Sequence, residues 1–193
     1  MAEQLAPVTG EELESGTHVA YFFRTNAERL AFVIPYIVAG LQKFERCIYI
    51  ADENTVSDIL TKFADAGVDV GEATANGALS VVTKHDSYLR HGAFEPERMI
   101  DDLDRDVRIA LQGGFSGLRV TGEMSWALDL PSVLVRLCDY EEKLRRHWPV
   151  QLSGLCQYNE MLFPVDVVKR MTGCHGTVVR DGKITRHAAS HAA

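Results

Sequence analysis

The pentapeptide Cys47-Ile48-Tyr49-Ile50-Ala51 decides the predicted fold, because it is apolar at every position. A strand with one solvent-exposed face alternates between apolar and polar residues, whereas a strand covered on both faces is apolar throughout. The pentapeptide therefore predicts an interior strand of a parallel sheet with helices on both sides. Asp52 and Glu53 follow it directly, and we interpret them as ending the strand and opening the next helix.

Similar apolar runs recur along the chain, and stretches with helical periodicity separate them. The further predicted strands are residues 18–23 (HVAYFF), 79–83 (LSVVT), 118–121 (LRVT) and 151–158 (QLSGLCQY). A helical apolar stripe fills residues 30–41. Because strand and helix alternate at least four times, we expect an α/β fold with a doubly wound, mostly parallel sheet.

The ends of the predicted elements carry recognisable turn and cap residues. Thr25 and Glu28 have the spacing of a capping box before the first helix, and Pro35 is expected to kink that helix. Asp181-Gly182 lies between two β-prone runs, which predicts an antiparallel hairpin at one edge of the sheet. We expect a single domain over residues 17–186, preceded by a flexible leader (1–16) and followed by a flexible tail (187–193).

The 193-residue chain is acidic, with 20 Lys and Arg, 27 Asp and Glu, and a formal net charge of -7. Direct nucleic-acid binding is disfavoured, because it needs clustered cations and the basic residues here are scattered. The first residues are acidic and polar, unlike a signal peptide. The apolar stretch at 30–41 is too short to span a bilayer. We therefore expect a soluble, cytoplasmic protein that does not enter the membrane.

Cysteine and histidine spacing gives no sign of a metal site. No two cysteines form a CxxC pair, which favours reduced, buried and inert thiols at Cys47, Cys138, Cys156 and Cys174. His18 begins an apolar strand, His85 and His91 lie in a polar loop, and no third ligand follows at metal-binding spacing. The sequence thus predicts neither a metal nor another cofactor.

In a doubly wound sheet, ligands bind outside the carboxyl ends of the strands. The first such turn, residues 23–27, contains no glycine and no lysine, so a phosphate-binding loop is not expected there. Glu123 and Trp126 follow the predicted strand 118–121, where a carboxylate could orient a polar ligand atom and an indole could cover an apolar one. The alternative is that Glu123 caps a turn and Trp126 packs on the sheet. Asp52 and Glu53 could act as a base or metal pair, or could simply cap a helix.

Several runs resemble one known family, the methanogen/methylotroph sensory (MEDS) domain named after a dichloromethane-responsive repressor. The most specific run is Gly122-Glu123-Met124-Ser125-Trp126, and residues 18–23, 44–53, 94–99 and 155–158 add to it. The resemblance implies a three-layer RecA/KaiC-like core that lacks the phosphate loop. It also implies sensing of hydrocarbon derivatives, often in chains that carry a helix-turn-helix, a histidine kinase or an anti-sigma-antagonist module.

The leading hypothesis is a non-catalytic sensory domain that binds a small, partly apolar ligand at the strand ends and shifts the loop 84–93. It would signal to a regulatory protein, which could be a kinase, an anti-sigma antagonist or a transcription factor, or would change its own association as a homo-oligomer. Two alternatives are a hydrolase-like enzyme using Glu123 or Asp52, and a pure interaction module. The predicted ligand-binding residues are Tyr21, Thr25, Glu28, Asp52, Glu53, Arg119, Thr121, Glu123, Trp126 and Tyr158.

Overall fold

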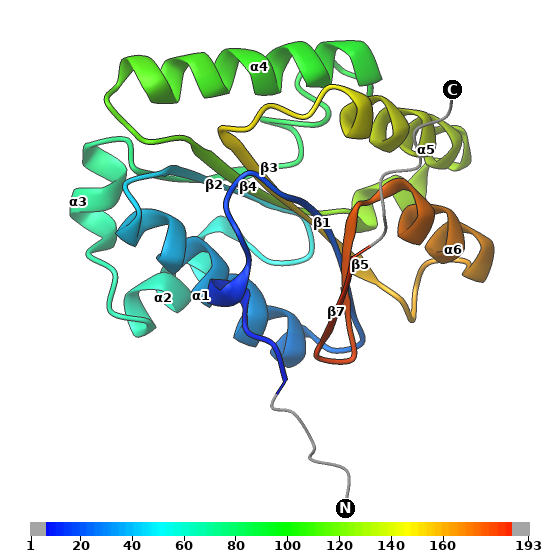
Figure 1. Ribbon diagram of the computed structural model, residues 1–193, viewed down its shortest axis with the longest axis horizontal. Helices are drawn as coiled ribbons and strands as arrows, with labels where there is room; N and C mark the ends of the chain where they lie inside the picture. Colours follow the sequence, from blue (N-terminus) through cyan, green and yellow to red (C-terminus); the bar gives the residue numbers. More distant parts are fainter. Residues whose placement is uncertain (1–6, 187–193) are drawn as a thin grey trace, which may run out of the picture.

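A computed structural model describes residues 7–186, which form a seven-stranded sheet between two layers of helices (Figure 1). The strand order is β3-β2-β4-β5-β1-β6-β7, and every neighbouring pair is parallel except β6 and β7. This confirms the predicted doubly wound α/β fold with an antiparallel hairpin. The strands are β1 His18–Phe23, β2 Arg46–Ala51, β3 Leu79–Thr83, β4 Leu118–Glu123, β5 Leu152–Asn159, β6 Thr177–Arg180 and β7 Lys183–Arg186.

The helices divide between the two faces of the sheet. Figure 1 shows α4, α5 and α6 on one side and α1, α2 and α3 on the other. We call these the α4–α6 face and the α1–α3 face. The helices are α1 Asn26–Gln42, α2 Val56–Asp65, α3 Val70–Ala75, α4 Pro96–Gln112, α5 Pro131–Arg146 and α6 Val165–Cys174, with short 3-10 turns η1 Gly10–Glu12 and η2 Ser125–Asp129.

Each face has its own hydrophobic core, because successive strand residues point to opposite sides of the sheet. Ala20 and Phe22 of β1 pack into the α4–α6 core, whereas Val19 and Tyr21 pack into the α1–α3 core. The same alternation in β2 explains why the pentapeptide at 47–51 is apolar throughout. In the residues that the structure describes, no helix combines the length and the apolar character needed to cross a membrane.

The predicted cap residues are partly confirmed. Thr25 is the N-cap of α1 and accepts a hydrogen bond from the Glu28 N–H, but the Glu28 carboxylate accepts from the Arg24 N–H and not from Thr25. Pro35 lies inside α1, which continues to Gln42. At the hairpin, Asp181 and Gly182 both have positive φ, at 51° and 68°, as a primed turn requires.

The prediction that Asp52 and Glu53 open the second helix is wrong. Helix α2 begins later, at Val56, with Thr55 as its N-cap in a capping box with Asp58. The backbone N–H groups of Asp52 and Glu53 instead donate to the side chain of Glu123. A tertiary contact, which sequence spacing does not record, therefore fixes this turn.

Residues 7–16, which the sequence assigns to a leader, lie against α1. Leu13 is 3% exposed within the α1–α3 core. A Cβ on Gly10 would lie only 2.1 Å from the Phe32 carbonyl oxygen, so the chain passes α1 at a distance that only glycine permits.

Candidate functional site

Glu123, at the end of β4, is the centre of the strand-end region that the sequence singled out. Its side chain is 1% exposed. Oε1 accepts from the Tyr49 hydroxyl at 2.8 Å and from the Asn54 side-chain amide at 3.2 Å. Oε2 accepts from the backbone N–H groups of Asp52, Glu53 and Asn54. The buried carboxylate thus fastens the β2–α2 turn to β4.

A buried arginine completes this arrangement. Arg29 of α1 is 1% exposed, and its Nη1 lies 3.2 Å from Glu123 Oε2 and 3.6 Å from Glu53 Oε2. Beside it, Asp52 pairs with Lys84 at 2.6 Å and accepts from the Ser125 hydroxyl at 2.8 Å. The structure therefore brings Asp52, Glu53 and Glu123 together as predicted. However, the acceptor positions of Glu123 are taken by protein donors, which leaves little capacity for a ligand or for proton transfer.

Two other predicted residues on β4 are structural. Arg119 lies near the start of the strand, at the opposite end from the expected site, where it is fully buried and ion-paired with Glu45. Its Nη1 donates to the Tyr36 carbonyl at 3.2 Å, and its Cζ lies 4.4 Å from the centre of the Tyr36 ring. Thr121 is also buried and donates its hydroxyl to the Leu155 carbonyl at 2.9 Å. Arg119 therefore has protein partners at the end of β4 away from Glu123.

The predicted aromatic residues do not meet either. Trp126 and Tyr158 are buried in the α4–α6 core, where Trp126 stacks on Tyr88 with ring centres 4.9 Å apart. Tyr21 lies on the other face, in the α1–α3 core, and donates to the Glu28 carbonyl at 3.1 Å. The sheet itself separates Tyr21 from Trp126 and Tyr158, so these side chains cannot contact one small ligand together.

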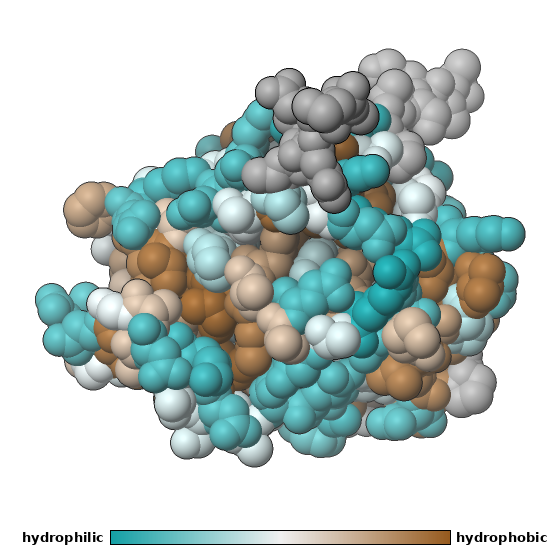
Figure 2. Space-filling view, turned by 90° about the horizontal axis from the view of Figure 1, so that it is seen from below, coloured by the Kyte–Doolittle hydropathy of each residue, from teal (hydrophilic) through white to brown (hydrophobic). Residues whose placement is uncertain are grey.

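Thr25 and Glu28 are exposed and lie just after the end of β1, next to the buried Tyr21. Tyr21 and Glu28 line an open groove of about 540 Å³ that residues 7–9 border. A second open groove, of about 450 Å³, lies between the end of α1 and the α2–α3 turn. Figure 2, which views the molecule from the α1 and α2 side, shows hydrophobic side chains gathered among hydrophilic ones there. Neither groove encloses a small molecule in the way that ligand pockets do.

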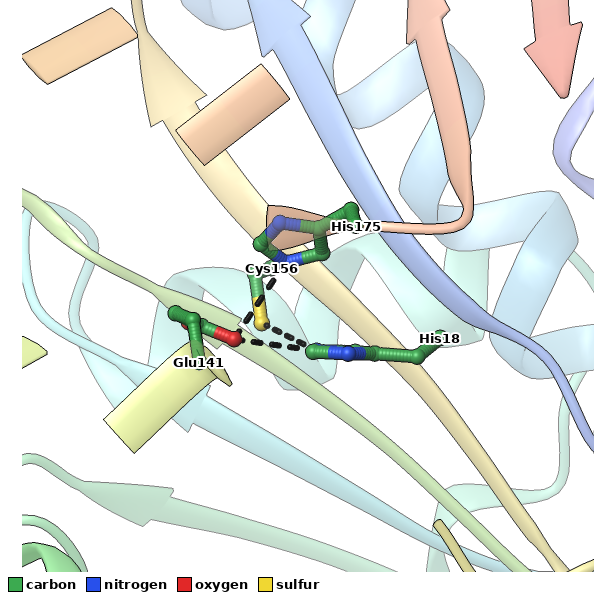
Figure 3. Close-up of side chains that lie close together, drawn as sticks. All are labelled: His18, Glu141, Cys156 and His175. Carbon is green, nitrogen blue, oxygen red and sulfur yellow. Dashed lines mark hydrogen bonds and ion pairs between the residues drawn. The ribbon is translucent and has the colours of Figure 1, made fainter. Parts of the chain in front are cut away.

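A different group of polar residues converges inside the α4–α6 face. His18 of β1, Glu141 of α5, Cys156 of β5 and His175, just after α6, each place one potential metal-ligand atom within 4.8 Å of all the others (Figure 3). Glu141 Oε2 lies 3.2 Å from His18 Nε2 and 3.4 Å from His175 Nε2, and Cys156 Sγ lies 3.5 Å from His18 Nε2. We call these four residues the His–Glu–Cys cluster.

Burial controls the protonation of this cluster. It lowers the pKa of His175 to about 4, so that imidazole is neutral at pH 7. Burial also raises the pKa of the Cys156 thiol well above its usual value. Burial alone would raise the pKa of Glu141. Interactions with His175, His18 and the Tyr158 hydroxyl outweigh burial and lower this pKa to about 2. A carboxylate, a thiol and a neutral imidazole therefore share one buried site.

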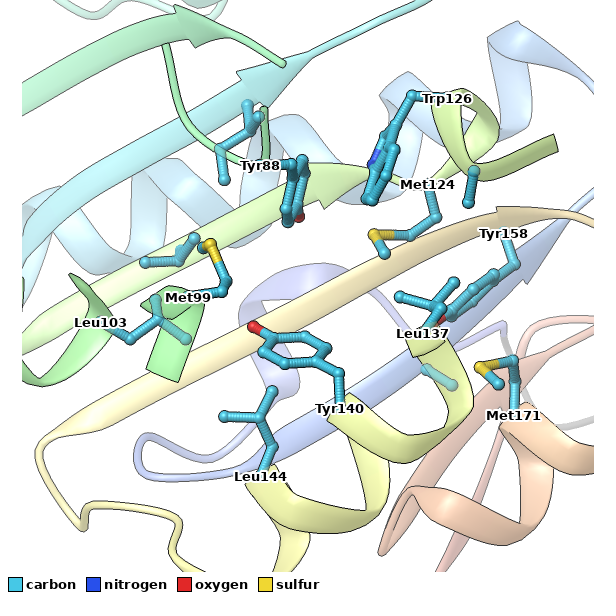
Figure 4. Close-up of a cluster of buried hydrophobic side chains, with 14 of the residues drawn as sticks. Tyr88, Met99, Leu103, Met124, Trp126, Leu137, Tyr140, Leu144, Tyr158 and Met171 are labelled. Atoms are coloured by element: carbon cyan, nitrogen blue, oxygen red, sulfur yellow. The ribbon is translucent and has the colours of Figure 1, made fainter. Parts of the chain in front are cut away.

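A small, partly enclosed cavity of about 30 Å³ borders the cluster. His18 and Cys156 form one part of its wall. Residues of β4, β5, α4 and α5 form the rest, together with Tyr88 and Trp148 from loops. Figure 4 shows Tyr88, Met99, Leu103, Tyr140 and Leu144 pointing toward one another over β4 and β5. Holding a single water molecule takes about 10–15 Å³, so this space suits a molecule of only a few non-hydrogen atoms.

Two glycines allow aromatic side chains to pack directly against this face of the sheet. A Cβ on Gly122 would lie 1.9 Å from the Tyr88 hydroxyl, and one on Gly154 would lie 2.4 Å from the tip of the Trp148 indole. Gly122 belongs to the Gly-Glu-Met-Ser-Trp run that the sequence analysis singled out for Glu123. Gly122 thus lies beside the cavity, whereas the side chain of Glu123 lies on the opposite face of the sheet.

The sequence analysis missed the His–Glu–Cys cluster because its members are 123, 15 and 19 residues apart along the chain, by the differences between positions 18, 141, 156 and 175. Metal motifs in sequence depend on ligands a few residues apart. One available signal was the placement of His18 and Cys156 in apolar strands, where a polar side chain needs a partner.

Comparison with known proteins gives the family. Residues 17–176 match the model of MEDS, the methanogen/methylotroph, DcmR sensory domain. The transcriptional repressor DcmR of Methylorubrum extorquens is 26% identical over 160 residues, which are 81% of this chain and 57% of the repressor. This chain thus spans little more than half of the repressor's length.

The solved structures support the fold. A KaiC-like protein from the hyperthermophilic archaeon Pyrococcus horikoshii OT3 superposes with a TM-score of 0.58 at 16% identity, covering 86% of this chain and 71% of the archaeal one. At that identity the likeness concerns the fold alone, here a RecA/KaiC-like three-layer core. The family match, which extends over most of the sequence, is the more specific finding, and on that basis the chain belongs to the MEDS family of sensory domains.

Proposed function

We propose that this MEDS domain senses a small, partly apolar hydrocarbon derivative that binds in the cavity of the α4–α6 face. The observation that carries the proposal is the cavity itself, which is partly enclosed, mostly apolar and bordered by a few polar groups. Ligand sites in proteins have this combination of an apolar wall and few polar contacts. The proposed site replaces the strand-end site expected from the sequence.

The lining residues suit a ligand with one polar end. Met99, Leu103, Val120 and Leu144 supply apolar surface, and the hydroxyl of Tyr88 reaches the cavity beside Gly122. His18 and Cys156 lie at the side of the cavity that faces the cluster. A molecule of one or two carbon atoms with a halogen or hydroxyl group matches this distribution of apolar and polar surface.

The walls of the cavity also offer a route for the signal. Met99 and Leu103 belong to α4 and Tyr140 and Leu144 to α5, so a ligand contacts both helices and the sheet at once. A ligand changes a conformational equilibrium only by binding one state better than the other. Occupancy of the cavity would therefore change how α4 and α5 pack on β4 and β5.

We further propose that the receiver of this signal is a cytoplasmic regulatory protein or segment: a kinase, an anti-sigma antagonist or a transcription factor. The similarity to a transcriptional repressor that is longer than this chain supports a regulatory output. A change of self-association would be a second way to pass on the same packing change.

Thermal unfolding with and without one-carbon halogenated compounds, short alcohols and ATP tests the proposal. A compound present at about 100 times its Kd stabilises the folded state by about 2.7 kcal/mol, which for a domain of this size raises Tm by about 5–10 °C. We expect dichloromethane or a similarly small molecule to raise Tm and ATP to leave it unchanged.

Two variants locate the site. Leu103→Phe fills the cavity and should abolish the rise in Tm, whereas Thr25→Ala, at the strand ends, should preserve it. The proposal fails if no small compound raises Tm. It also fails if Thr25→Ala removes the response and Leu103→Phe does not.

A further inference from the structure

The His–Glu–Cys cluster contains two buried polar atoms that face each other without a hydrogen bond. Within the described part of the chain, Glu141 Oε2 and His175 Nε2 both lack a hydrogen-bond partner. Glu141 and His175 have side chains that are fully buried, and their two atoms lie only 3.4 Å apart. Buried polar groups nearly always have partners, so two unpartnered atoms in contact need an explanation.

The orientation of the His175 ring shows which of its nitrogens contacts Glu141. Its Nδ1 lies 2.8 Å from the Met171 carbonyl oxygen, and a carbonyl can only accept, so Nδ1 carries the proton. Nε2 is then the ring atom that faces the carboxylate of Glu141, at 3.4 Å. A cation between the two atoms, either a proton or a metal ion, would satisfy both.

We propose that His18, Glu141, Cys156 and His175 bind a divalent transition-metal ion, with Zn²⁺ as the best match. Two imidazoles, a thiolate and a carboxylate are all ligands that Zn²⁺ accepts, whereas Mg²⁺ and Ca²⁺ prefer oxygen alone. Ligand atoms around tetrahedral Zn²⁺ lie about 3.3–3.8 Å apart, because the metal–ligand bonds are about 2.0–2.3 Å long. The measured separations of 3.2, 3.4 and 3.5 Å are close to that range.

Groups around the four ligands hold them in place. Besides the bond from His175 to Met171, the Tyr158 hydroxyl donates to Glu141 Oε1 at 2.9 Å, which leaves Oε2 directed at the cluster. The His18 ring stacks on Trp148 with centres 4.3 Å apart, and Trp148 is itself fixed by a 2.7 Å hydrogen bond to the Leu152 carbonyl. Metal-binding side chains are typically oriented by such outer partners.

The metal would join four elements that are distant in sequence: β1, α5, β5 and the end of α6. It would also form part of the wall of the cavity, because His18 and Cys156 belong to both. The metal site does not depend on the proposed sensing of a hydrocarbon derivative, and either proposal can fail without the other.

Metal analysis of the whole, untagged protein tests the inference directly. The protein is purified without chelator, and bound metals are quantified by mass spectrometry. We expect roughly one Zn²⁺ per chain, as a single four-ligand site requires. The ion is then removed by chelation and Co²⁺ is added, and the electronic spectrum should show a thiolate-to-Co²⁺ charge-transfer band with tetrahedral d–d bands.

Matched variants assign the ligands. Cys156→Ser should remove the charge-transfer band, and His175→Asn, which can still donate to the Met171 carbonyl, should weaken metal binding. We expect losses of more than about 100-fold, because even the loss of an outer partner weakens metal binding about 10- to 100-fold. Cys138→Ser removes another buried thiol of the same face, outside the cluster, and should change neither the spectrum nor the affinity.

Wild-type protein decides the question even where a variant does not fold. The inference is overturned if purified wild type holds no transition metal and the chelated protein gives no thiolate–Co²⁺ band. It is equally overturned if Cys138→Ser removes the band and Cys156→Ser, folded by circular dichroism, retains it.

Discussion

The two faces of the sheet both bury charged side chains, and they treat them differently. On the α1–α3 face, Glu123 accepts from two side chains and three backbone N–H groups and pairs with Arg29. On the α4–α6 face, Glu141 accepts one hydrogen bond through Oε1, and its Oε2 faces two imidazoles without one. Both oxygens of Glu123 thus accept hydrogen bonds from the protein, whereas Oε2 of Glu141 accepts none.

This difference shows how to separate structural charges from functional ones in a fold of this kind. A buried charge whose acceptors are all occupied holds elements together and has no capacity left for a ligand. A buried cluster with unused acceptors, next to a cavity, can still bind something. The KaiC-like neighbour shares only the fold, and folds of one type host sites in different places. Hydrogen-bond satisfaction therefore distinguishes Glu123 from Glu141.

The largest effect is expected from removing Glu123, whose two carboxylate oxygens both accept hydrogen bonds. Glu123→Ala leaves Arg29 buried without its carboxylate and leaves the β2–α2 turn without its acceptor. Removing one partner of a buried ion pair destabilises proteins by about 3–5 kcal/mol, and urea unfolding should show a loss of this size.

The matching control lies on the surface. Asp65→Ala removes one partner of the exposed Lys62–Asp65 pair and should change the free energy of unfolding by less than about 1 kcal/mol. If Glu123→Ala were no more destabilising than Asp65→Ala, Glu123 would not be the structural anchor described above.

A smaller effect is expected at the cavity of the α4–α6 face. Leu103→Ala should destabilise the protein by about 2–3 kcal/mol, at the low end for leucine truncation, because the side chain already borders open space. Denaturant unfolding measures this loss, and the enlarged cavity should accept larger hydrocarbon derivatives in the thermal assay.

Leu79 of β3, buried in the α1–α3 core, provides the comparison for Leu103. Leu79→Ala creates a new void in packed surroundings and should cost about 3–4 kcal/mol without changing ligand preference. Equal costs at the two positions, together with an unchanged ligand range for Leu103→Ala, would count against a functional cavity.

The smallest effect is expected at the strand end of β1. Thr25→Ala removes the N-cap hydrogen bond from the Glu28 N–H and should cost about 1 kcal/mol in the free energy of unfolding. Its equilibrium unfolding curve should shift accordingly, while any response to small ligands stays as in wild type. If Thr25→Ala had normal stability but no longer responded to small ligands, the ligand site would lie at the strand ends and not in the cavity.

Much of the fold could be predicted from local pattern. The apolar pentapeptide at 47–51 and the alternation of strands and helices predicted a parallel sheet covered on both sides, and Asp181-Gly182 predicted the hairpin. Thr25 was recognised as a cap because the N-cap bond is made three residues away. Each of these signals lies within a few residues, where spacing fixes geometry.

The site was harder to predict, because its residues are set by contacts across the sheet. Tyr21 and Tyr158 were grouped as neighbours of one ligand, yet the period of two in each strand sends them to opposite faces. Arg119 was predicted to contact the ligand, but it lies near the start of β4 and pairs with Glu45. Glu123, Asp52 and Glu53 do meet, but the hydrogen bonds among them satisfy the carboxylate that a ligand would have used.

The sequence by itself determined the fold class, the family resemblance and the absence of glycine and lysine in the first strand–helix turn. Periodicity, turn chemistry and motif residues are local properties, which a linear pattern records. Only the tertiary structure decided which polar residues from distant parts of the chain come together. His18, Glu141, Cys156 and His175 come together solely because β1 pairs with β5 and because α5 and α6 pack on that face. Convergence of this kind depends on the packed chain, and no spacing in the sequence encodes it.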